Sequence, residues 1–190
     1  MPYVSSPDPY CYPNSSVLKN IPSLKSHDLL EQFEARVTAL RAEEPLPTGR
    51  FSMRHYQSIH HHLFQDVYAW AGKFRTVRLS KQDSMFCYPE HIESQMKNLF
   101  KELKQKQFLK ALDKEDFATA ATRFLSTLNA IHPFREGNGR TQLIFLALLG
   151  NNAGHPLNLN QLKPAQFLSA MIASFSGDEK PLNTVICSLL

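Results

Sequence analysis

Apolar residues recur every three to four positions over most of this chain, which is the period of helices that bury one face. This pattern predicts one helix from Ser26 to the turn at residues 45–49 and a second from Ser52, through Val67 and Tyr68, to the break at residues 70–72. Further helices are predicted over residues 90–107, 113–131, 141–151 and 164–175, with a short helix or tail over 182–190. The 141–151 stretch is apolar on nearly every side, so we expect it at the centre of the core.

Two stretches depart from the helical period. Residues 1–25 are rich in Pro, Ser and Tyr, and the prolines prevent a long helix, so an extended arm is expected. Between residues 74 and 88, Val77 and Leu79 alternate with Arg78 and Ser80 before a polar turn at 81–84, which predicts a short β-hairpin. The exposed edge of this hairpin could accept another chain by strand addition, and a surface loop without a partner is the alternative.

The predicted elements define an all-α fold, with one globular domain over residues 26–190 that carries the small hairpin. A chain of 190 residues with 43% hydrophobic content can bury one core. The formal charge of +4 comes from interspersed charges, which suits anionic ligands and does not indicate nucleic acid. No run of 18 apolar residues occurs, so the sequence indicates no membrane partner.

The cysteine and histidine patterns exclude the obvious metal sites. Cys11, Cys87 and Cys187 are far apart and odd in number, which favours a reducing cytosol. The consecutive histidines at 60–62 fall on a predicted helix, where neighbours point about 100° apart and do not converge on one ion. We therefore expect core packing or polar contacts for these histidines.

The densest chemistry lies in nine consecutive residues, His132-Pro133-Phe134-Arg135-Glu136-Gly137-Asn138-Gly139-Arg140. A loop with two glycines can turn backbone N–H groups inward as an anion-binding concavity. The helix that follows adds unpaired N–H groups and a partial positive charge. With a histidine and a carboxylate alongside, the stretch predicts a phosphate site with a base beside it.

This stretch resembles the signature of the Fic family, His-Pro-Phe-x-(Asp/Glu)-Gly-Asn-Gly-Arg-x-x-Arg, at every defined position up to Arg140. Asp8-Pro9-Tyr10, the residues from His60 to Gly72, and Phe86-Cys87 are also similar to the family. The resemblance implies an all-α Fic fold with a β-hairpin flap beside the active site. It also implies transfer of AMP from ATP to a hydroxyl side chain of a target protein, as in Fic domains of bacterial toxins and of effectors delivered by type IV secretion.

The motif residues suit that chemistry. A Ser, Thr or Tyr hydroxyl needs a base to take its proton, and His132 is the candidate. Glu136 can supply a carboxylate oxygen to Mg²⁺, which typically uses one or two protein carboxylates together with phosphate oxygens and water. Main-chain donors of Gly137, Asn138 and Gly139, with the guanidinium of Arg140, are expected to hold the phosphates.

The family resemblance adds further expectations. It implies that the Asn138 side chain also touches the phosphates and that Phe134 packs in the core, while Arg135 occupies a variable position and is expected to be exposed. Specificity is expected to reside partly in the flap, residues Val77, Arg78, Leu79 and Ser80, where an extended target segment would dock.

One position departs from the family pattern. The second motif arginine should stand at position 143, where this chain has Leu143. Its absence removes one charged contact, worth roughly 1.5 to 3 kcal/mol if fully formed. Three hypotheses follow: an AMP-transferase, a Fic enzyme with another donor or with AMP-removing activity, and a catalytically weak module that presents the hairpin to a partner.

Regulation and location follow from the same resemblance. No Ser/Thr-x-x-x-Glu-Gly/Asn inhibitory motif occurs in the chain, so a separate small antitoxin-like partner is the expected inhibitor. No charged and apolar leader opens the sequence, although a specialised secretion machine could still carry it. The expected location is the bacterial cytoplasm, or the host-cell cytosol if the chain is the first domain of a secreted effector.

Overall fold

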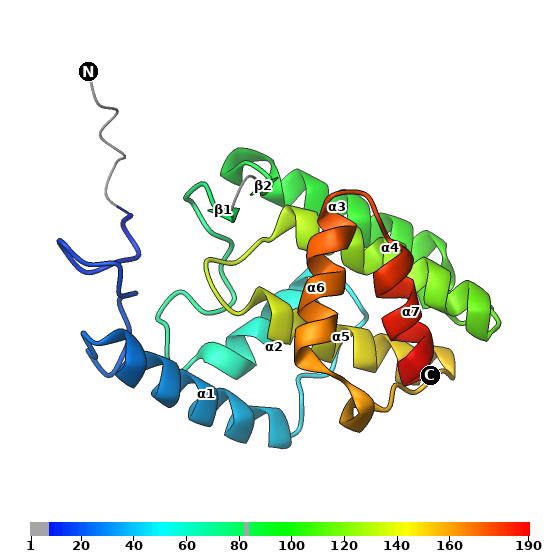
Figure 1. Cartoon of the computed structure of the whole chain (residues 1–190), viewed down its shortest axis with the longest axis horizontal. Helices are drawn as coiled ribbons and strands as arrows, with labels where there is room; N and C mark the ends of the chain where they lie inside the picture. The colour runs from blue at the N-terminus through cyan, green and yellow to red at the C-terminus, as the bar shows by residue number, and fades with distance from the viewer. Residues whose placement is uncertain (1–7, 82–83) are drawn as a thin grey trace.

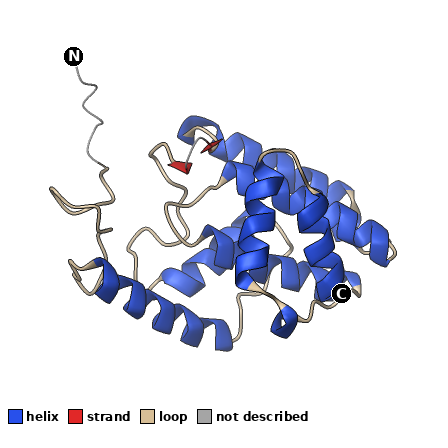
Figure 2. Ribbon diagram, in the orientation of Figure 1, coloured by secondary structure: helices blue, strands red, loops and turns tan. Residues whose placement is uncertain are grey.

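The structure, a computed structural model, describes residues 8–81 and 84–190 and is built almost entirely from helices (Figure 2). Gln82 and Asp83, at the centre of the predicted polar turn, lie outside the described residues. In chain order the elements are α1 (His27–Glu43), α2 (Met53–Phe64), β1 (Ser80–Lys81), β2 (Ser84–Met85), α3 (Pro89–Gln105), the 3₁₀ turn η1 (Gln107–Leu109), α4 (Lys114–Ile131), α5 (Asn138–Ala153), the 3₁₀ turn η2 (Leu159–Gln161), α6 (Pro164–Phe175) and α7 (Lys180–Leu189) (Figure 1).

Local chemistry explains where several helices begin. The Ser52 hydroxyl accepts the N–H of His55 at 3.2 Å to start α2, and the Asp113 carboxylate accepts the N–H of Asp116 at 2.9 Å to start α4. Proline occupies the first position of α3 and α6, where its missing N–H costs nothing. These helices are confirmed close to their predicted starts.

Helix α2 ends at Phe64, before the predicted Val67 and Tyr68. The chain turns there because the N–H groups of Val67 and Tyr68 both bond the Phe64 carbonyl, at 2.9 Å each. The turn lets the Tyr68 ring stack on Trp70, with ring centroids 4.3 Å apart. The longer helix predicted from the apolar spacing is therefore wrong at its end, because packing between the aromatic rings requires a turn.

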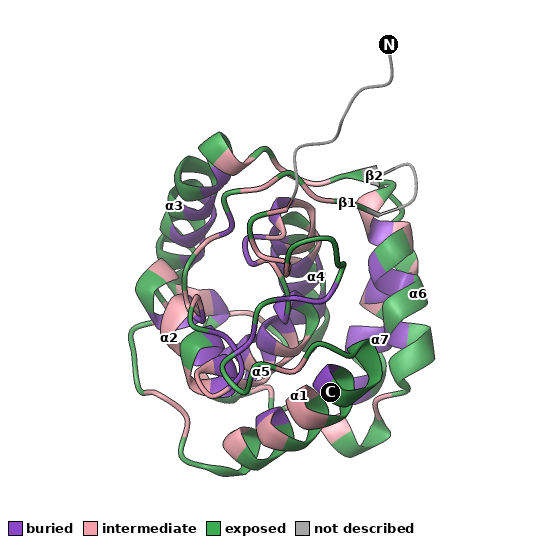
Figure 3. Cartoon of the chain, turned by 90° about the vertical axis from the view of Figure 1, so that its left-hand side faces the viewer, coloured by how far each residue is buried: buried purple, intermediate pink, exposed green. Residues whose placement is uncertain are grey.

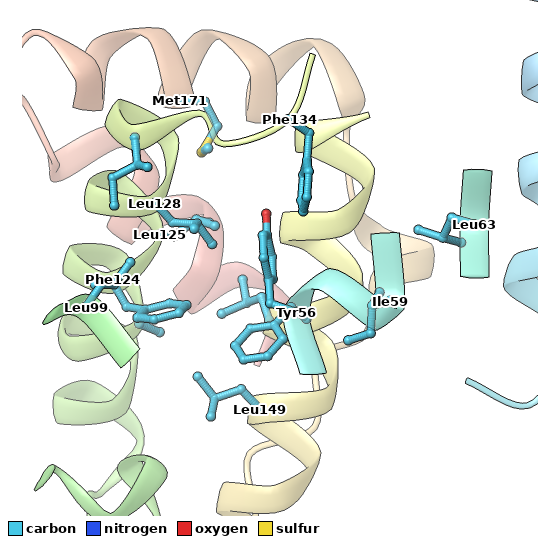
Figure 4. Close-up of a cluster of buried hydrophobic side chains, with 14 of the residues drawn as sticks. Tyr56, Ile59, Leu63, Leu99, Phe124, Leu125, Leu128, Phe134, Leu149 and Met171 are labelled. Carbon is cyan, nitrogen blue, oxygen red and sulfur yellow. The ribbon is translucent and has the colours of Figure 1, made fainter. Parts of the chain in front are cut away.

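The core is formed around α2, α4 and α5, with buried residues also on α3, α6 and α7. Figure 3 shows several of these buried faces. Tyr56 of α2 packs between the α4 side and the Phe134 ring, which stacks on it at 5.5 Å (Figure 4). From α5, Phe145, Leu146 and Leu149 are all buried. The prediction that the 141–151 stretch is central is confirmed.

The segment predicted as an extended arm is folded over its described part, residues 8–25. A β-bridge joins Cys11 to Leu18, and the N–H of Tyr12 donates to the Val17 carbonyl at 3.0 Å. Val17 and Leu18 are buried as part of the core. Prolines exclude a helix here but do not prevent the chain from turning back and burying apolar side chains, so the extended shape is wrong for these residues.

The predicted hairpin is confined to two residues in each strand. Ser80 pairs with Met85 and Lys81 with Ser84 in antiparallel register, and the N–H of Phe86 donates to the Leu79 carbonyl at 3.2 Å. Residues 74–79 belong to no strand, although Val77 and Leu79 alternate with polar residues. The alternation predicted longer strands than the structure has. Hydrogen bonds from the side chain and main chain of Arg75, instead of a sheet ladder, hold residues 74–79 in place.

Candidate active site

All motif residues except Pro133 and Phe134 line a cleft of about 670 Å³ between the ends of α4 and α5, the β1 segment and α6. His132, Glu136, Gly137, Asn138, Gly139 and Arg140 all face it. The structure thus brings together every motif residue that the sequence assigns to catalysis, phosphate binding or metal binding.

His132 sits at the C-terminal end of α4 in a left-handed conformation, with φ 49° and ψ 62°. Its N–H closes the helix on the Leu128 carbonyl at 3.0 Å, and Pro133 follows. The imidazole stacks on Phe86 with ring centroids 4.0 Å apart and planes 17° apart. The left-handed residue turns the chain sharply, which places the histidine at the cleft instead of continuing the helix.

Helix α5 begins at Asn138, three residues before the predicted start at Thr141. Gly137 precedes it in a left-handed conformation, with φ 79°. The N–H groups of residues 138–140 therefore belong to the first helical turn, where no carbonyl of the same helix can accept them. The N–H groups expected to hold the phosphates thus belong to the N-terminus of a helix, except that of Gly137, which donates to Oε1 of Glu136 at 2.9 Å.

The Asn138 side chain holds the loop together. Its Oδ1 accepts the N–H of Phe134 at 2.9 Å, and its Nδ2 donates to the Phe134 carbonyl at 2.8 Å. Both polar atoms of this buried amide are thus engaged within the loop. The side-chain contact with a phosphate that the family implies stays a prediction. Phe134 is fully buried, as expected.

His60 supports the same loop from α2. Its Nδ1 accepts the N–H of Gly72 at 2.8 Å, so its Nε2 carries the proton and donates to the Glu136 carbonyl at 3.0 Å. The ring stacks between Phe134 and Phe64, with centroids 3.7 and 4.7 Å away. Burial lowers the pKa of His60 to about 3. Its role is structural, and no cluster of three metal-binding side chains occurs among the described residues.

The depressed pKa of His60 predicts a loss of stability in acid. The unfolded chain binds a proton at His60 below pH 6.5, whereas the folded chain does so only near pH 3. The free energy of unfolding should therefore fall between these values, by at most about 1.4 kcal/mol per pH unit from this residue. Urea titrations at several pH values give the free energy of unfolding as a function of pH. This free energy should change less steeply with pH in His60→Gln than in the wild type. The matched change His91→Gln, at an exposed position, should keep the wild-type slope.

Both arginines of the cleft are ion-paired with the N-terminal part of the chain. Arg140 pairs with Glu34 of α1 and donates to the Thr38 hydroxyl at 3.0 Å. Arg135 pairs with Asp8 at 2.9 Å, so the expectation that Arg135 is exposed is wrong. A bound phosphate would share each guanidinium with a carboxylate.

Glu136 is exposed, and its Oε1 accepts the N–H of Gly137 at 2.9 Å. Its second carboxylate oxygen is thereby left as the better placed donor for a metal ion held together with phosphate oxygens.

Of the four residues assigned to target docking, Leu79 and Ser80 line the cleft. The Arg78 guanidinium lies over the Tyr88 ring, 4.3 Å from its centroid, and the Val77 carbonyl accepts a bond from Arg75 at 2.6 Å. Leu143 also lines the cleft, half-buried, where the family has its second arginine.

Helix α6 contributes an apolar wall to the cleft that was not predicted from the sequence, formed by Phe167, Leu168, Met171, Ile172 and Phe175. A signal was present, because Leu168 and Ile172 lie one helical turn apart and make α6 apolar beyond a single face. In the structure their side chains are 52% and 45% exposed. Covering the core does not require apolar side chains at these two exposed positions.

The fold and the cleft define an all-helical domain with a histidine beside a helix N-terminus suited to phosphate. The chain belongs to the Fic/DOC family, whose model matches residues 50–149. It is 48% identical over 181 residues, 95% of this chain and 94% of the relative, to the probable protein adenylyltransferase y4lH of Sinorhizobium fredii. It is also 35% identical, over 97% of its length, to the protein adenylyltransferase VbhT of Bartonella schoenbuchensis, of which it spans 39%.

A solved structure gives the same fold. The BepC protein of Bartonella tribocorum, described as a VirB-translocated effector with bound AMPPNP, superposes with a TM-score of 0.84 at 28% identity, covering 95% of each chain. The helical Fic fold predicted from the sequence is confirmed.

Proposed function

We propose that this chain is a protein adenylyltransferase, which transfers AMP from ATP to a hydroxyl side chain of a target protein. Relatives that align over nearly the whole chain carry this activity in their names. The observation that carries the proposal is the shared cleft, in which His132 stands beside the unpaired N–H groups at the start of α5. A base and a phosphate cradle in one cleft are the two parts that this transfer needs.

The reaction joins the target hydroxyl oxygen to the α-phosphorus of ATP and breaks the bond from that phosphorus to pyrophosphate. His132 accepts the hydroxyl proton as the oxygen attacks. The first-turn N–H groups of residues 138–140 and the Arg140 guanidinium stabilise the phosphate oxygens, on which negative charge grows. Asn138 and His60 keep the loop in place by their bonds to Phe134 and to the Glu136 carbonyl.

The residues present fit a Mg²⁺ ion. Glu136 offers an exposed carboxylate at the cleft, and a single protein carboxylate is sufficient for Mg²⁺ when phosphate oxygens and water complete its shell. The ion would neutralise charge on the pyrophosphate leaving group. Glu136 is the residue that would hold it.

Leu143 supports a second candidate function, that of a Fic enzyme that uses another nucleotide donor. Both arginines among the described residues that line the cleft already pair with a carboxylate, of Asp8 or of Glu34. Leu143 adds an apolar surface where the family has a cation. The triphosphate therefore makes fewer charged contacts than in the family pattern. Because GTP, UTP and CTP carry the same triphosphate, the choice among these donors falls to contacts with the nucleobase.

One experiment separates these functions. The chain is incubated with Mg²⁺, bacterial lysate and ATP, GTP, UTP or CTP labelled at the α-phosphate. Label from ATP on a discrete protein supports AMP transfer, and label from another nucleotide alone supports the altered donor. Absence of label and of nucleotide binding would leave a module that only binds a partner.

We also propose that residues 77–80 act as a docking flap for the target. The short β1–β2 pair stands at the cleft, and Leu79 and Ser80 line it, so a segment added along this edge would place its hydroxyl near His132. Contact of the Phe86 ring with His132 ties the same segment to the base.

The flap proposal predicts a selective effect of proline. Val77→Pro removes a main-chain N–H that an added strand could use, so label transfer should fall at least about tenfold while ATP affinity stays within about twofold. Initial rates and calorimetric ATP titrations measure the two quantities. Val77→Ala keeps the N–H and should resemble the wild type. Equal losses of transfer and ATP binding in Val77→Pro would contradict docking.

We also propose how the protein is regulated and where it acts. A small separate inhibitor is the proposed regulator, because the chain has no inhibitory motif of its own. The bacterial cytoplasm and the host-cell cytosol are the proposed locations, the latter supported by similarity to a translocated effector. Among the described residues no helix is both long and apolar enough to cross a bilayer.

A further inference from the structure

Arg75 lies between the flap and the end of α4 and is only 2% exposed. Its guanidinium donates to four main-chain carbonyls: Nε to His132 at 2.8 Å, Nη1 to Val77 at 2.6 Å, and Nη2 to Cys87 at 2.6 Å and Ile131 at 3.2 Å. Each of its bonds in the structure goes to a carbonyl oxygen. A buried cation held in this way is unusual, since buried charges are normally paired with an opposite charge.

The end of α4 supplies the electrostatic partner. The last carbonyls of a helix have no N–H of the same helix to accept, and they carry the partial negative charge of the helix dipole. Arg75 satisfies those of Ile131 and His132. It does so at the residue that leaves the helix in a left-handed conformation, which is strained for any residue other than glycine.

Two further main-chain bonds join the same segments. The N–H of Arg75 donates to the Pro133 carbonyl at 2.9 Å, and the N–H of Cys87 donates to the Ala130 carbonyl at 3.1 Å. The residue before Cys87 is Phe86, whose ring stacks on His132. The segment 75–87, which contains the flap, is thus bonded at both ends to residues on either side of His132, and the Arg75 side chain lies between these two attachments.

We propose that Arg75 is a positioning residue that holds His132 in its left-handed conformation and clamps both ends of the flap to it. Residues 77 and 87 and the histidine then move as one unit. If the protein transfers AMP as proposed above, a target segment docked on the flap has its hydroxyl in register with the base. Arg75 acts through His132 and needs no contact with substrate.

A spectroscopic test is independent of catalysis. In the ¹H–¹³C spectrum of the histidine rings, the His132 signal is assigned by its loss in His132→Ala. Its ring protons should be shifted upfield, because they lie against the face of Phe86. In Arg75→Met the upfield shift should collapse. Arg41→Met removes an arginine that pairs with Glu44 and Asp66, away from the cleft, and should leave the signal in place.

The kinetic test uses label transfer from ATP to lysate protein at a fixed lysate concentration. Arg75→Met should lower the rate at saturating ATP about 100-fold, the scale of a misplacement near 1 Å, and leave KM for ATP within about twofold. Arg75→Lys keeps the charge but reaches fewer carbonyls, so its rate should lie between those of the wild type and Arg75→Met. It also serves as the test if Arg75→Met does not fold.

Two results would overturn the proposal. One is a His132 signal that stays upfield in folded Arg75→Met or Arg75→Lys. The other is a rate loss that appears only as a higher KM for ATP. Failure of the wild type to label any protein would count against AMP transfer and leave the spectroscopic test of Arg75 valid.

Discussion

Replacing His132 by alanine is expected to lower the rate of AMP transfer by about 10²- to 10⁴-fold, the usual contribution of a general base. The hydroxyl of the target is a weak nucleophile while it keeps its proton, and we propose that His132 accepts this proton. Transfer of α-labelled ATP onto lysate protein measures the rate.

Nucleotide affinity should survive the same change. We assign phosphate binding to the start of α5 and to Arg140. His132 lies at the other end of the motif loop along the chain, at the C-terminus of α4. Calorimetry with a non-hydrolysable ATP analogue should give a Kd within about threefold of the wild type, which is less than 1 kcal/mol. The exposed change His91→Ala controls for loss of a histidine. Transfer by His132→Ala within tenfold of the wild type would place the base elsewhere.

The second large effect is expected from Gly137→Ala. A Cβ added at Gly137 would lie 2.3 Å from Cζ of Phe64, whose ring is fully buried and stacked on His60. The residue also has φ of 79°, which strains any side chain. Together these predict a loss of about 2 to 4 kcal/mol in the free energy of unfolding, measured by urea denaturation.

Gly139 provides a matched control two residues away. Apart from its chain neighbours and the backbone of its own helix, no heavy atom lies within 4 Å of a Cβ built there, and the residue is inside α5. Gly139→Ala should therefore leave the free energy of unfolding unchanged or raise it by up to about 1 kcal/mol. Equal destabilisation by the two changes would show that the tight approach of Phe64 to Gly137 does not define the loop.

The helices could be predicted because each must bury an apolar face, and that requirement is written into the spacing of its own residues. Helices α2 and α4 begin next to Ser52 and Asp113, as predicted from the apolar spacing, and the structure shows that these two side chains cap them. Errors occurred where distant contacts decide. At the turn that follows α2, Trp70 packs on Tyr10 of the arm, with ring centroids 5.5 Å apart. The described arm residues fold back because Val17 and Leu18 reach the core.

The start of α5 shows the same division within the motif. Gly-Asn-Gly is typical of a loop, so the sequence predicted a helix only from Thr141. The structure starts it at Asn138, because Asn138 is bonded to Phe134, and Phe134 is held against His60 and Tyr56. The hairpin was overestimated for a comparable reason: Arg75 takes the Val77 carbonyl that a longer ladder would need.

The sequence by itself determined the helical class and the chemistry available to the motif. Nine adjacent residues carry the proposed base, the carboxylate and the proposed phosphate donors, and chain connectivity keeps them together. Only the tertiary structure decided what surrounds them. His60, Arg75, Glu34 and the α6 wall are distant from the motif along the chain, and no local period specifies their partners. Those partners are chosen when the helices pack, because a buried polar group is stable only beside the particular donor or acceptor that packing brings to it.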